Sequence, residues 1–285
     1  NIVSDDVRAA LGSVFTNKYA EGYPGKRYYG GNEVIDELEC LCQKSALDLF
    51  GLSENEWSVN VQPYSGSPAN MAVYAALVPL GEKIMGMELK MGGHLSHGHK
   101  VSLTGKLWRQ IPYGVSRETE TLDYDAILEI AKKEKPKLII AGFTAYSRII
   151  NFKAFRKIAD AVDAILLVDM SHFAGLVAGK AYPSPFSAEG GQALADVVMT
   201  TTHKTLRGSR GAMIFARKIP MLHASDSMLH DSINKAVFPG LQGGPHNNTT
   251  AGIAVALEKA AGKPFSLYAK AIVSNAKTLA DELLK

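Results

Sequence analysis

Three segments of the sequence carry side chains suited to chemistry at positions where a strand ends or a helix begins. Lys204 follows the run VMTTT at 198–202, Asp169 lies where the apolar run 164–170 ends, next to Met170, and residues 65–70 read SGSPAN. A lysine in a desolvated site loses basicity and can form a Schiff base with a carbonyl compound. A carboxylate at the end of a buried strand is costly unless a cationic group pairs with it.

The segment SGSPAN predicts the start of a helix and, with it, a binding site for phosphate. Ser67 is a good N-cap residue, Pro68 suits the first helical position, and the helix continues through MAVYAAL. Backbone N–H groups at a helix start have no partner within the helix and attract anions. The hydroxyls of Ser65 and Ser67, on either side of Gly66, add further donors.

Taken singly, each segment has a plainer interpretation: a surface lysine, a carboxylate that caps a turn, and an ordinary helix cap. Together they supply what pyridoxal 5'-phosphate (PLP) requires, namely a lysine for the Schiff base, a carboxylate facing the pyridinium nitrogen and a phosphate cradle. The combination therefore predicts a PLP site with the Schiff base on Lys204, opposite Asp169.

Apolar strands alternate with amphipathic helices along the part of the chain that must position these groups. We expect strands at 137–143, 164–170, 195–202 and 211–217, and a helix at 152–162 with one apolar face. This alternation predicts an α/β fold with a mostly parallel central sheet and helices on both faces. In such sheets ligands bind beyond the carboxyl ends of the strands, where Asp169 and Lys204 lie.

Three histidines in GGHLSHGHK, at positions 94, 97 and 99, allow more than one interpretation. They could be surface residues, or an imidazole could lie against an aromatic cofactor. A metal-dependent hydrolase would add Asp169 and His172 as ligands. The spacing shows neither an i,i+4 helical pair nor strand alternation, so we predict no metal site.

Composition excludes several classes of protein. The net charge of +3 and the absence of a basic block argue against nucleic acid as a partner. No run approaches the roughly 18 apolar residues of a membrane span. Cys40 and Cys42 are interpreted as reduced thiols on a helix, which suits an intracellular protein. We expect a cytoplasmic location, with a mitochondrial or other organellar form left open.

The sequence also resembles the serine hydroxymethyltransferase family through six motifs that occur in the family's order. They are NKYAEGYPGKRYYGG (17–31), VQPYSGSPANMAVY (61–74), GGHLSHG (92–98), VDMSHFAGL (168–176), TTTHKTLRGSRG (200–211) and FPGLQGGP (238–245). The resemblance implies the large domain of a fold-type I PLP-dependent transferase. Such an enzyme interconverts serine and glycine and passes the one-carbon unit to tetrahydrofolate, its co-substrate.

The resemblance also implies roles for individual residues around the cofactor. Lys204 would carry PLP and Asp169 would pair with its ring nitrogen. Further contacts would come from Ser65, Gly66, Ser67 and His203 at the phosphate, His94 stacked on the ring, Thr144 and His172 near the phenolic oxygen, and Thr201 beside the lysine.

Similar enzymes build each site from two subunits, so the resemblance implies a homodimer or a dimer of dimers. The residues that would reach a neighbour's site are Tyr19, Glu21, Tyr28 and Tyr29, with Gly243 and Gly244 at its phosphate. Glu21 would be the acid/base group beside the substrate hydroxymethyl, a role that suits a carboxyl whose pKa a partly buried site raises. The positions near the folate would be Leu89, Gly93 and Leu95.

The chain begins and stops within patterns that look interrupted. We expect an N-terminal segment at 1–17, a PLP-binding large domain at 18–262, and a helix at 263–285 that leads toward a small C-terminal domain. The resemblance places the arginine that grips the substrate carboxylate in that domain. The chain alone is therefore expected to bind amino acids poorly and to be inactive.

Three alternatives remain open at this point. A related fold-type I enzyme, such as a threonine aldolase, would act without folate. The metal-dependent hydrolase would use the histidines. A catalytically silent homologue would serve as a binding scaffold, although the presence of Lys204 and Asp169 argues against it.

Overall fold

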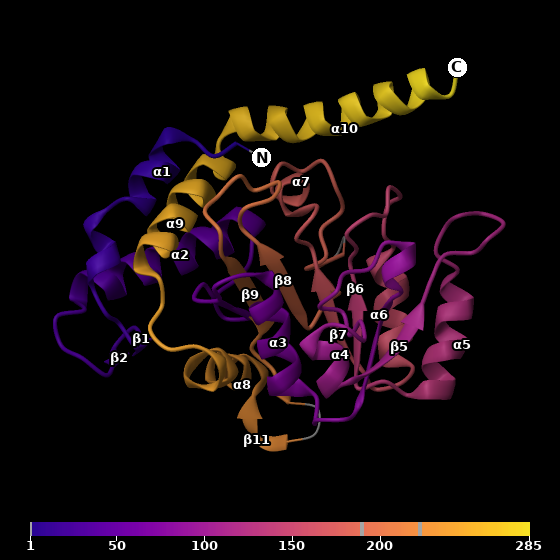
Figure 1. Ribbon diagram of the computed structural model, residues 1–285, viewed down its shortest axis with the longest axis horizontal. Coiled ribbons are helices and arrows are strands. Elements are labelled where there is room, and N and C mark those ends of the chain that lie inside the picture. The colour runs from indigo at the N-terminus through magenta and orange to yellow at the C-terminus, as the bar shows by residue number, and fades with distance from the viewer. Residues whose placement is uncertain (1, 189–190, 222–223) are drawn as a thin grey trace.

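A seven-stranded sheet with helices on both faces forms the body of the protein (Figure 1). The computed structural model describes residues 2–188, 191–221 and 224–285. The strand order is β3-β9-β8-β7-β6-β4-β5, and β9 alone in this sheet runs antiparallel to its neighbours. The strands are β3 (Trp57–Asn60), β4 (Lys83–Met87), β5 (Arg109–Tyr113), β6 (Leu138–Ala141), β7 (Ile165–Asp169), β8 (Val197–Thr201) and β9 (Ala212–Arg217). The predicted fold class is confirmed.

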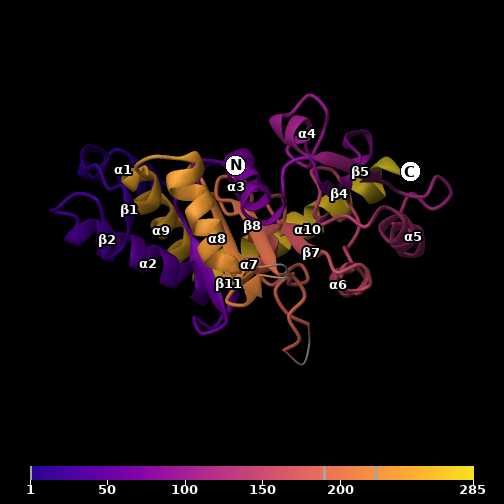
Figure 2. The same ribbon diagram turned by 90° about the horizontal axis from the view of Figure 1, so that it is seen from below.

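The described helices and small hairpins surround this sheet. The helices are α1 (Asp5–Leu11), α2 (Glu33–Phe50), α3 (Gly66–Leu77), α4 (Leu103–Leu107), α5 (Tyr124–Glu134), α6 (Phe152–Asp160), α7 (Ala174–Ala178), α8 (Leu229–Lys235), α9 (Asn247–Ala261) and α10 (Lys263–Leu283), with short turns η1 (Val14–Asn17), η2 (Leu89–Met91) and η3 (Ala236–Leu241). The hairpins pair β1 (Gly22–Tyr23) with β2 (Lys26–Arg27) and β10 (Pro220–Met221) with β11 (Ala224–Met228). Figure 2 shows α1, α2 and α9 grouped at one end of the molecule and α5 and α6 at the other.

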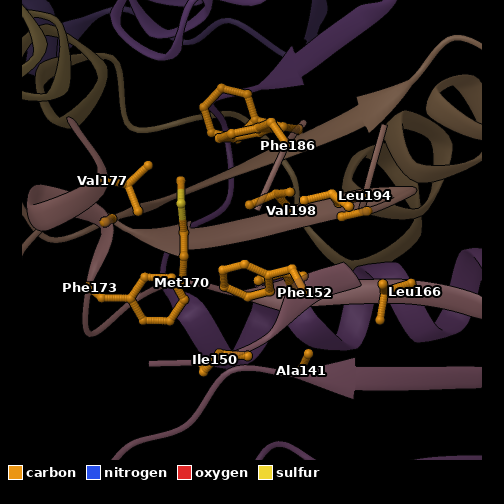
Figure 3. Close-up of a cluster of buried hydrophobic side chains, with 14 of the residues drawn as sticks. Ala141, Ile150, Phe152, Leu166, Met170, Phe173, Val177, Phe186, Leu194 and Val198 are labelled. Carbon is orange, nitrogen blue, oxygen red and sulfur yellow. The ribbon is translucent and has the colours of Figure 1, made fainter. Parts of the chain in front are cut away.

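Two apolar cores lie on opposite faces of the sheet because successive strand residues point to opposite sides. Leu166 and Val168 of β7 pack in one core with Phe152 of α6 (Figure 3). Leu167, between them, packs in the other core with Val73 of α3. A strand covered on both faces must be apolar throughout, which explains why the run 164–170 shows no alternation.

The predicted strands are found in the structure, each one to three residues shorter than the apolar run that predicted it. The last helix also forms, with Phe265 and Ala269 buried near its start. Farther along the helix, the described residues bury little of the apolar stripe. Ile272 is half-buried, and Ala276, Leu279 and Leu283 are exposed. Only the first part of α10 packs on α7 and α9, and the rest extends along the outside of the molecule (Figure 1).

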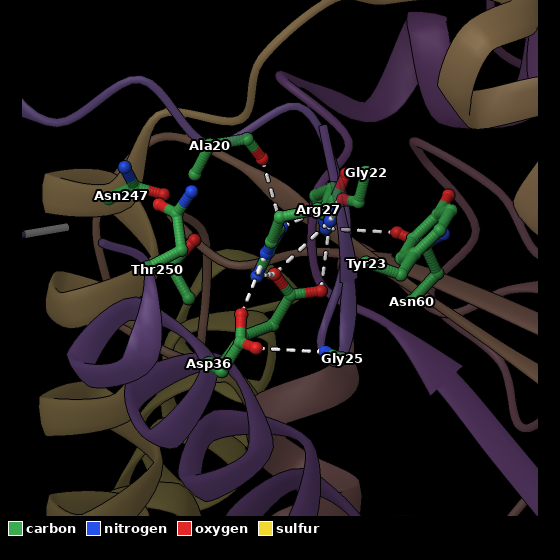
Figure 4. Close-up of polar contacts among 12 residues, drawn as sticks. Ala20, Gly22, Tyr23, Gly25, Arg27, Asp36, Asn60, Asn247 and Thr250 are labelled. Atoms are coloured by element: carbon green, nitrogen blue, oxygen red, sulfur yellow. Dashed lines mark hydrogen bonds and ion pairs between the residues drawn. The ribbon is translucent and has the colours of Figure 1, made fainter. Parts of the chain in front are cut away.

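A buried ion network fixes the segment 18–31 to α2 (Figure 4). The guanidinium of Arg27 donates to the carbonyls of Ala20 and Gly22 and to the carboxylates of Asp36 and Glu39. The side chains of Arg27 and Glu39 are 4% and 5% exposed. Because neither charge reaches bulk water, each depends on the other for compensation.

We predict that Arg27→Leu lowers the free energy of unfolding by about 3 kcal/mol, because it leaves the Glu39 carboxylate buried without its cation. Burial already raises the pKa of Glu39 against the opposing effect of Arg27. A raised pKa in the folded state favours the protonated, uncharged form of Glu39. The loss of unfolding free energy in Arg27→Leu should therefore be smaller at about pH 5 than at about pH 8. Urea unfolding of both proteins at the two pH values measures this loss.

The control for this prediction is Lys44→Met, which removes an exposed ion pair with Asp48. That variant should leave the free energy of unfolding nearly unchanged, because an exposed ion pair contributes little to stability. Equal losses in the two variants would contradict the role of the buried network.

Candidate active site

A cavity lies at the carboxyl ends of β7 and β8 and at the start of α3. It is lined by Ser65, Gly66, Ser67, Asn70, His94, His97, Phe143, Thr144, Asp169, Ser171, His172, Met199, Thr201, His203 and Lys204. Every residue that we expected to contact the cofactor from the same chain is among them. The remaining five, Asn70, His97, Phe143, Ser171 and Met199, were not predicted to contact the cofactor. The parallel strands account for this gathering, because their carboxyl ends meet at one edge of the sheet.

Asp169 is the last residue of β7 and is only 7% exposed. Its Oδ2 accepts hydrogen bonds from His97 Nε2 (2.9 Å) and Asn70 Nδ2 (3.1 Å), and its Oδ1 accepts one from the backbone N–H of Ser171 (3.1 Å). Burial by itself would raise the pKa of Asp169, but the contacts with His97, Ser171 and Asn70 outweigh it and hold the pKa well below its usual range. The site therefore contains a buried, ionised carboxylate.

His97 has a role that the sequence did not reveal. Its ring is 1% exposed, and it bonds the carboxylate of Asp169. Surface exposure, one of the interpretations left open for this segment, is wrong for His97. Nothing in the sequence separated it from His99, which lies outside the cavity lining. In the described part of the chain, no group of three or more His, Cys, Asp or Glu side chains is arranged to hold a metal ion.

The ring of His94 borders the cavity and is half-buried. Its Nδ1 accepts a hydrogen bond from the backbone N–H of Ser96 (3.1 Å) and lies 2.7 Å from the Ser96 hydroxyl. Burial, together with the neighbouring His97, lowers the pKa of His94 and favours a neutral ring. A neutral imidazole fixed at Nδ1 can lie flat against an aromatic ligand.

Lys204 follows β8 and is half-buried at the cavity wall. Its Nζ donates a hydrogen bond to Thr201 Oγ1 (3.3 Å). Burial lowers the pKa of Lys204, and Arg210 adds to this effect while Asp169 opposes it. A larger fraction of this amine is therefore uncharged at a given pH than in an exposed lysine, and the uncharged amine is the nucleophile.

The helix start at the cavity differs from the predicted one. Ser65, not Ser67, is the N-cap: its backbone is extended and its carbonyl accepts the first helical bond, from Ala69 N (3.0 Å). The helix thus begins at Gly66, and Pro68 takes its third position, where a missing N–H costs nothing. The earlier start leaves the N–H groups of Gly66 and Ser67 free of helical partners, which strengthens the case for an anion site.

Gly66 is required by the close approach of the neighbouring strand. A Cβ atom at this position would lie 2.7 Å from Cγ2 of Thr201. The glycine therefore allows the start of α3 to pack directly against the end of β8.

The residues expected to serve a neighbouring subunit form a separate cluster outside the cavity. Tyr29 donates a hydrogen bond from its hydroxyl to Glu21 Oε2 (3.0 Å), and its ring lies edge-on to Tyr19. Gly243 and Gly244 lie against the Glu21 and Tyr19 side chains. Tyr19, Tyr28 and Tyr29 are more than half exposed.

The three positions expected near the folate also lie outside the cavity lining. Leu89 belongs to η2, Gly93 packs closely on the backbone at Met87, and Leu95 is exposed. Their segment nevertheless reaches the cavity, because His94 lines it and the carbonyl of Gly92 accepts a hydrogen bond from the backbone N–H of Thr144 (2.8 Å).

We predict that acylation of Lys204 by acetic anhydride has its pH midpoint below that of Lys44. Burial lowers the pKa of Lys204, whereas the pKa of Lys44 is raised by its bond to Asp48. The cofactor-free protein is labelled over a pH series, and peptide mass spectrometry gives the extent of acylation of Lys204 and of Lys44 at each pH. The two pH midpoints are then compared, so the absolute reaction rates do not matter. A midpoint for Lys204 at or above that of Lys44 would show that its amine is not perturbed.

Comparison with known proteins identifies the family of the chain. The family model described as serine hydroxymethyltransferase matches residues 1–285. Relatives named serine hydroxymethyltransferase include those of Caenorhabditis briggsae (52% identical) and Acidothermus cellulolyticus (51%), and the chloroplastic form 3 of Arabidopsis thaliana is 50% identical. Each match covers all of this chain and 57%, 62% and 53% of the relative, respectively.

The chain thus spans a little over half the length of these relatives. Among the described residues, no helix is both long and apolar enough to cross a membrane. The resemblance seen in the motifs is confirmed over the whole chain, and the chain belongs to the serine hydroxymethyltransferase family.

Proposed function

We propose that the protein interconverts serine and glycine with PLP as cofactor, and that it transfers the hydroxymethyl carbon to tetrahydrofolate. The observation that carries this proposal is that the amine of Lys204, the carboxylate of Asp169 and the start of α3 line one cavity. Membership of the family supports the choice of reaction.

The residues of the cavity fit PLP in charge and in hydrogen bonding. The ionised carboxylate of Asp169 suits a protonated ring nitrogen. The free N–H groups of Gly66 and Ser67 suit the phosphate. His203 lines the same cavity, and its buried Nδ1 has no hydrogen-bond partner among the described residues. A phosphate oxygen would supply one.

When bound, PLP supplies an electron sink for the cleavage of bonds at the substrate α-carbon. The cavity residues would bind and orient it: Lys204 would hold the cofactor, Asp169 would keep a proton on the ring nitrogen, and His94 would lie against the ring. Thr201 holds the Lys204 amine through its hydroxyl. Thr144 and His172 also line the cavity and would contact the phenolic oxygen.

The proposal extends to a second subunit, as a homodimer or a dimer of dimers. Glu21 and its tyrosines lie outside the cavity; the tyrosines are exposed and Glu21 is half-buried, which supports their use in a neighbour's site. In that site Glu21 would be the acid/base group at the substrate hydroxyl, and Gly244 would approach the phosphate. Leu89, Gly93 and Leu95 would border the folate.

The proposed organisation keeps residues 18–262 as the PLP-binding large domain and 263–285 as a helix leading to a smaller one. We propose a reducing compartment such as the cytoplasm, which suits the free thiols of Cys40 and Cys42. Relatives named as mitochondrial and chloroplastic forms occur in Candida glabrata and Arabidopsis thaliana.

We predict that added PLP produces a visible absorbance band, that borohydride makes the attachment permanent, and that the label lies on Lys204. Lys204→Ala should abolish the covalent label, because its amine is the one at the cavity wall. Peptide mass spectrometry after reduction locates the attachment. Lys106→Ala, which changes a lysine outside the cavity, is the matched control and should label as the unchanged protein does. Equal labelling of the Lys204→Ala protein would refute the assignment.

A further inference from the structure

Gln242 joins two parts of the chain that are far apart in sequence. Its side chain is buried, Oε1 accepts from the backbone N–H of Tyr64 (3.0 Å), and Nε2 donates to the carbonyl of Gln62 (2.9 Å). The amide thus forms two hydrogen bonds to residues 62–64, as a neighbouring strand would. Because buried backbone groups must be paired, these two bonds hold the 242–246 loop firmly in place.

Tyr64 adds two contacts to the same loop. Its hydroxyl donates to the carbonyl of Gly244 (2.7 Å), and its ring stacks on His246 with centroids 4.1 Å apart and planes 4° apart. Tyr64 directly precedes Ser65, the N-cap of α3. A displacement of the 242–246 loop therefore moves the residue that sets the helix start.

The other side of this loop packs on the segment that carries Glu21. A Cβ atom at Gly243 would lie 3.3 Å from Glu21 Oε1, and one at Gly244 would lie 3.3 Å from the Tyr19 ring. Asn247, just after the loop, donates to the carbonyl of Lys18 (2.6 Å). The loop therefore contacts both Tyr64, the residue just before the proposed phosphate cradle, and the Glu21 cluster.

We propose that Gln242 and Tyr64 are positioning residues that couple occupation of the phosphate cradle at the start of α3 to the position of the segment 18–31. This inference rests on the proposed PLP site. The side-chain bonds of Gln242 and Tyr64 join residues 62–64, just before the start of α3, to the 242–246 loop, and the other side of that loop contacts Glu21 and Tyr19. Binding of the cofactor phosphate thereby orders the Glu21 cluster, which the same subunit presents to its neighbour.

Hydrogen exchange in the whole protein tests the coupling, with PLP as the probe. PLP at a concentration that saturates the visible absorbance of each variant should slow amide exchange in peptides covering 63–69 and also in those covering 18–31. In Gln242→Met, which keeps the side-chain length and removes both bonds, the effect at 63–69 should persist. The effect at 18–31 should fall to the part that direct contact with the neighbouring subunit's PLP supplies. Tyr64→Phe keeps the stacked ring and removes only the hydroxyl bond, so it should lose part of the effect.

The matched control is Tyr124→Phe, which likewise removes one hydroxyl bond to the backbone, at Asn151, away from the cavity. It should behave as the unchanged protein. The coupling would be overturned if PLP protected 18–31 as strongly in both Gln242→Met and Tyr64→Phe as in the unchanged protein. It would also be overturned if PLP did not protect 18–31 in the unchanged protein. Lack of any PLP effect at 63–69 in the unchanged protein would instead overturn the proposed cofactor site, and the coupling with it.

Discussion

The burial of one ionised carboxylate, that of Asp169, constrains the rest of the site. It lies at the end of a strand that is apolar on both faces, and donors from α3, from the segment 92–98 and from its own turn hold it. Such a charge is stable only where its surroundings compensate for it. A protonated ring nitrogen in the cavity is the compensation that we propose.

The topology explains why the other groups lie beside this carboxylate. Strands β6, β7 and β8 are parallel neighbours, so Thr144, Asp169 and Lys204 follow strand ends at the same edge of the sheet. Close packing holds these ends together. Gly142 has a positive φ of 116°, and a Cβ there would lie 2.0 Å from the carbonyl oxygen of Asp169, so only glycine fits.

Much of this arrangement was predictable because two simple rules act locally. Unbroken apolar runs identify buried parallel strands, and ligands bind where those strands end, which is how Asp169 and Lys204 were recognised. The roles of His97 and Gln242 were not predictable. Each depends on partners 72 to 180 residues away, and a histidine or glutamine in a glycine-rich segment shows nothing of them. The Ser65 cap was missed because Ser67 before Pro68 matched the usual pattern of a helix start equally well.

The central claim is that Asp169 holds a proton on the ring nitrogen of bound PLP. The nitrogen-15 chemical shift of labelled PLP in the holoenzyme reports the protonation state of that atom directly. The account predicts the shift of a protonated pyridinium at neutral pH, moving toward that of neutral pyridine in Asp169→Asn. A neutral pyridine shift in the unchanged protein, or the same pyridinium shift in both proteins, would contradict it.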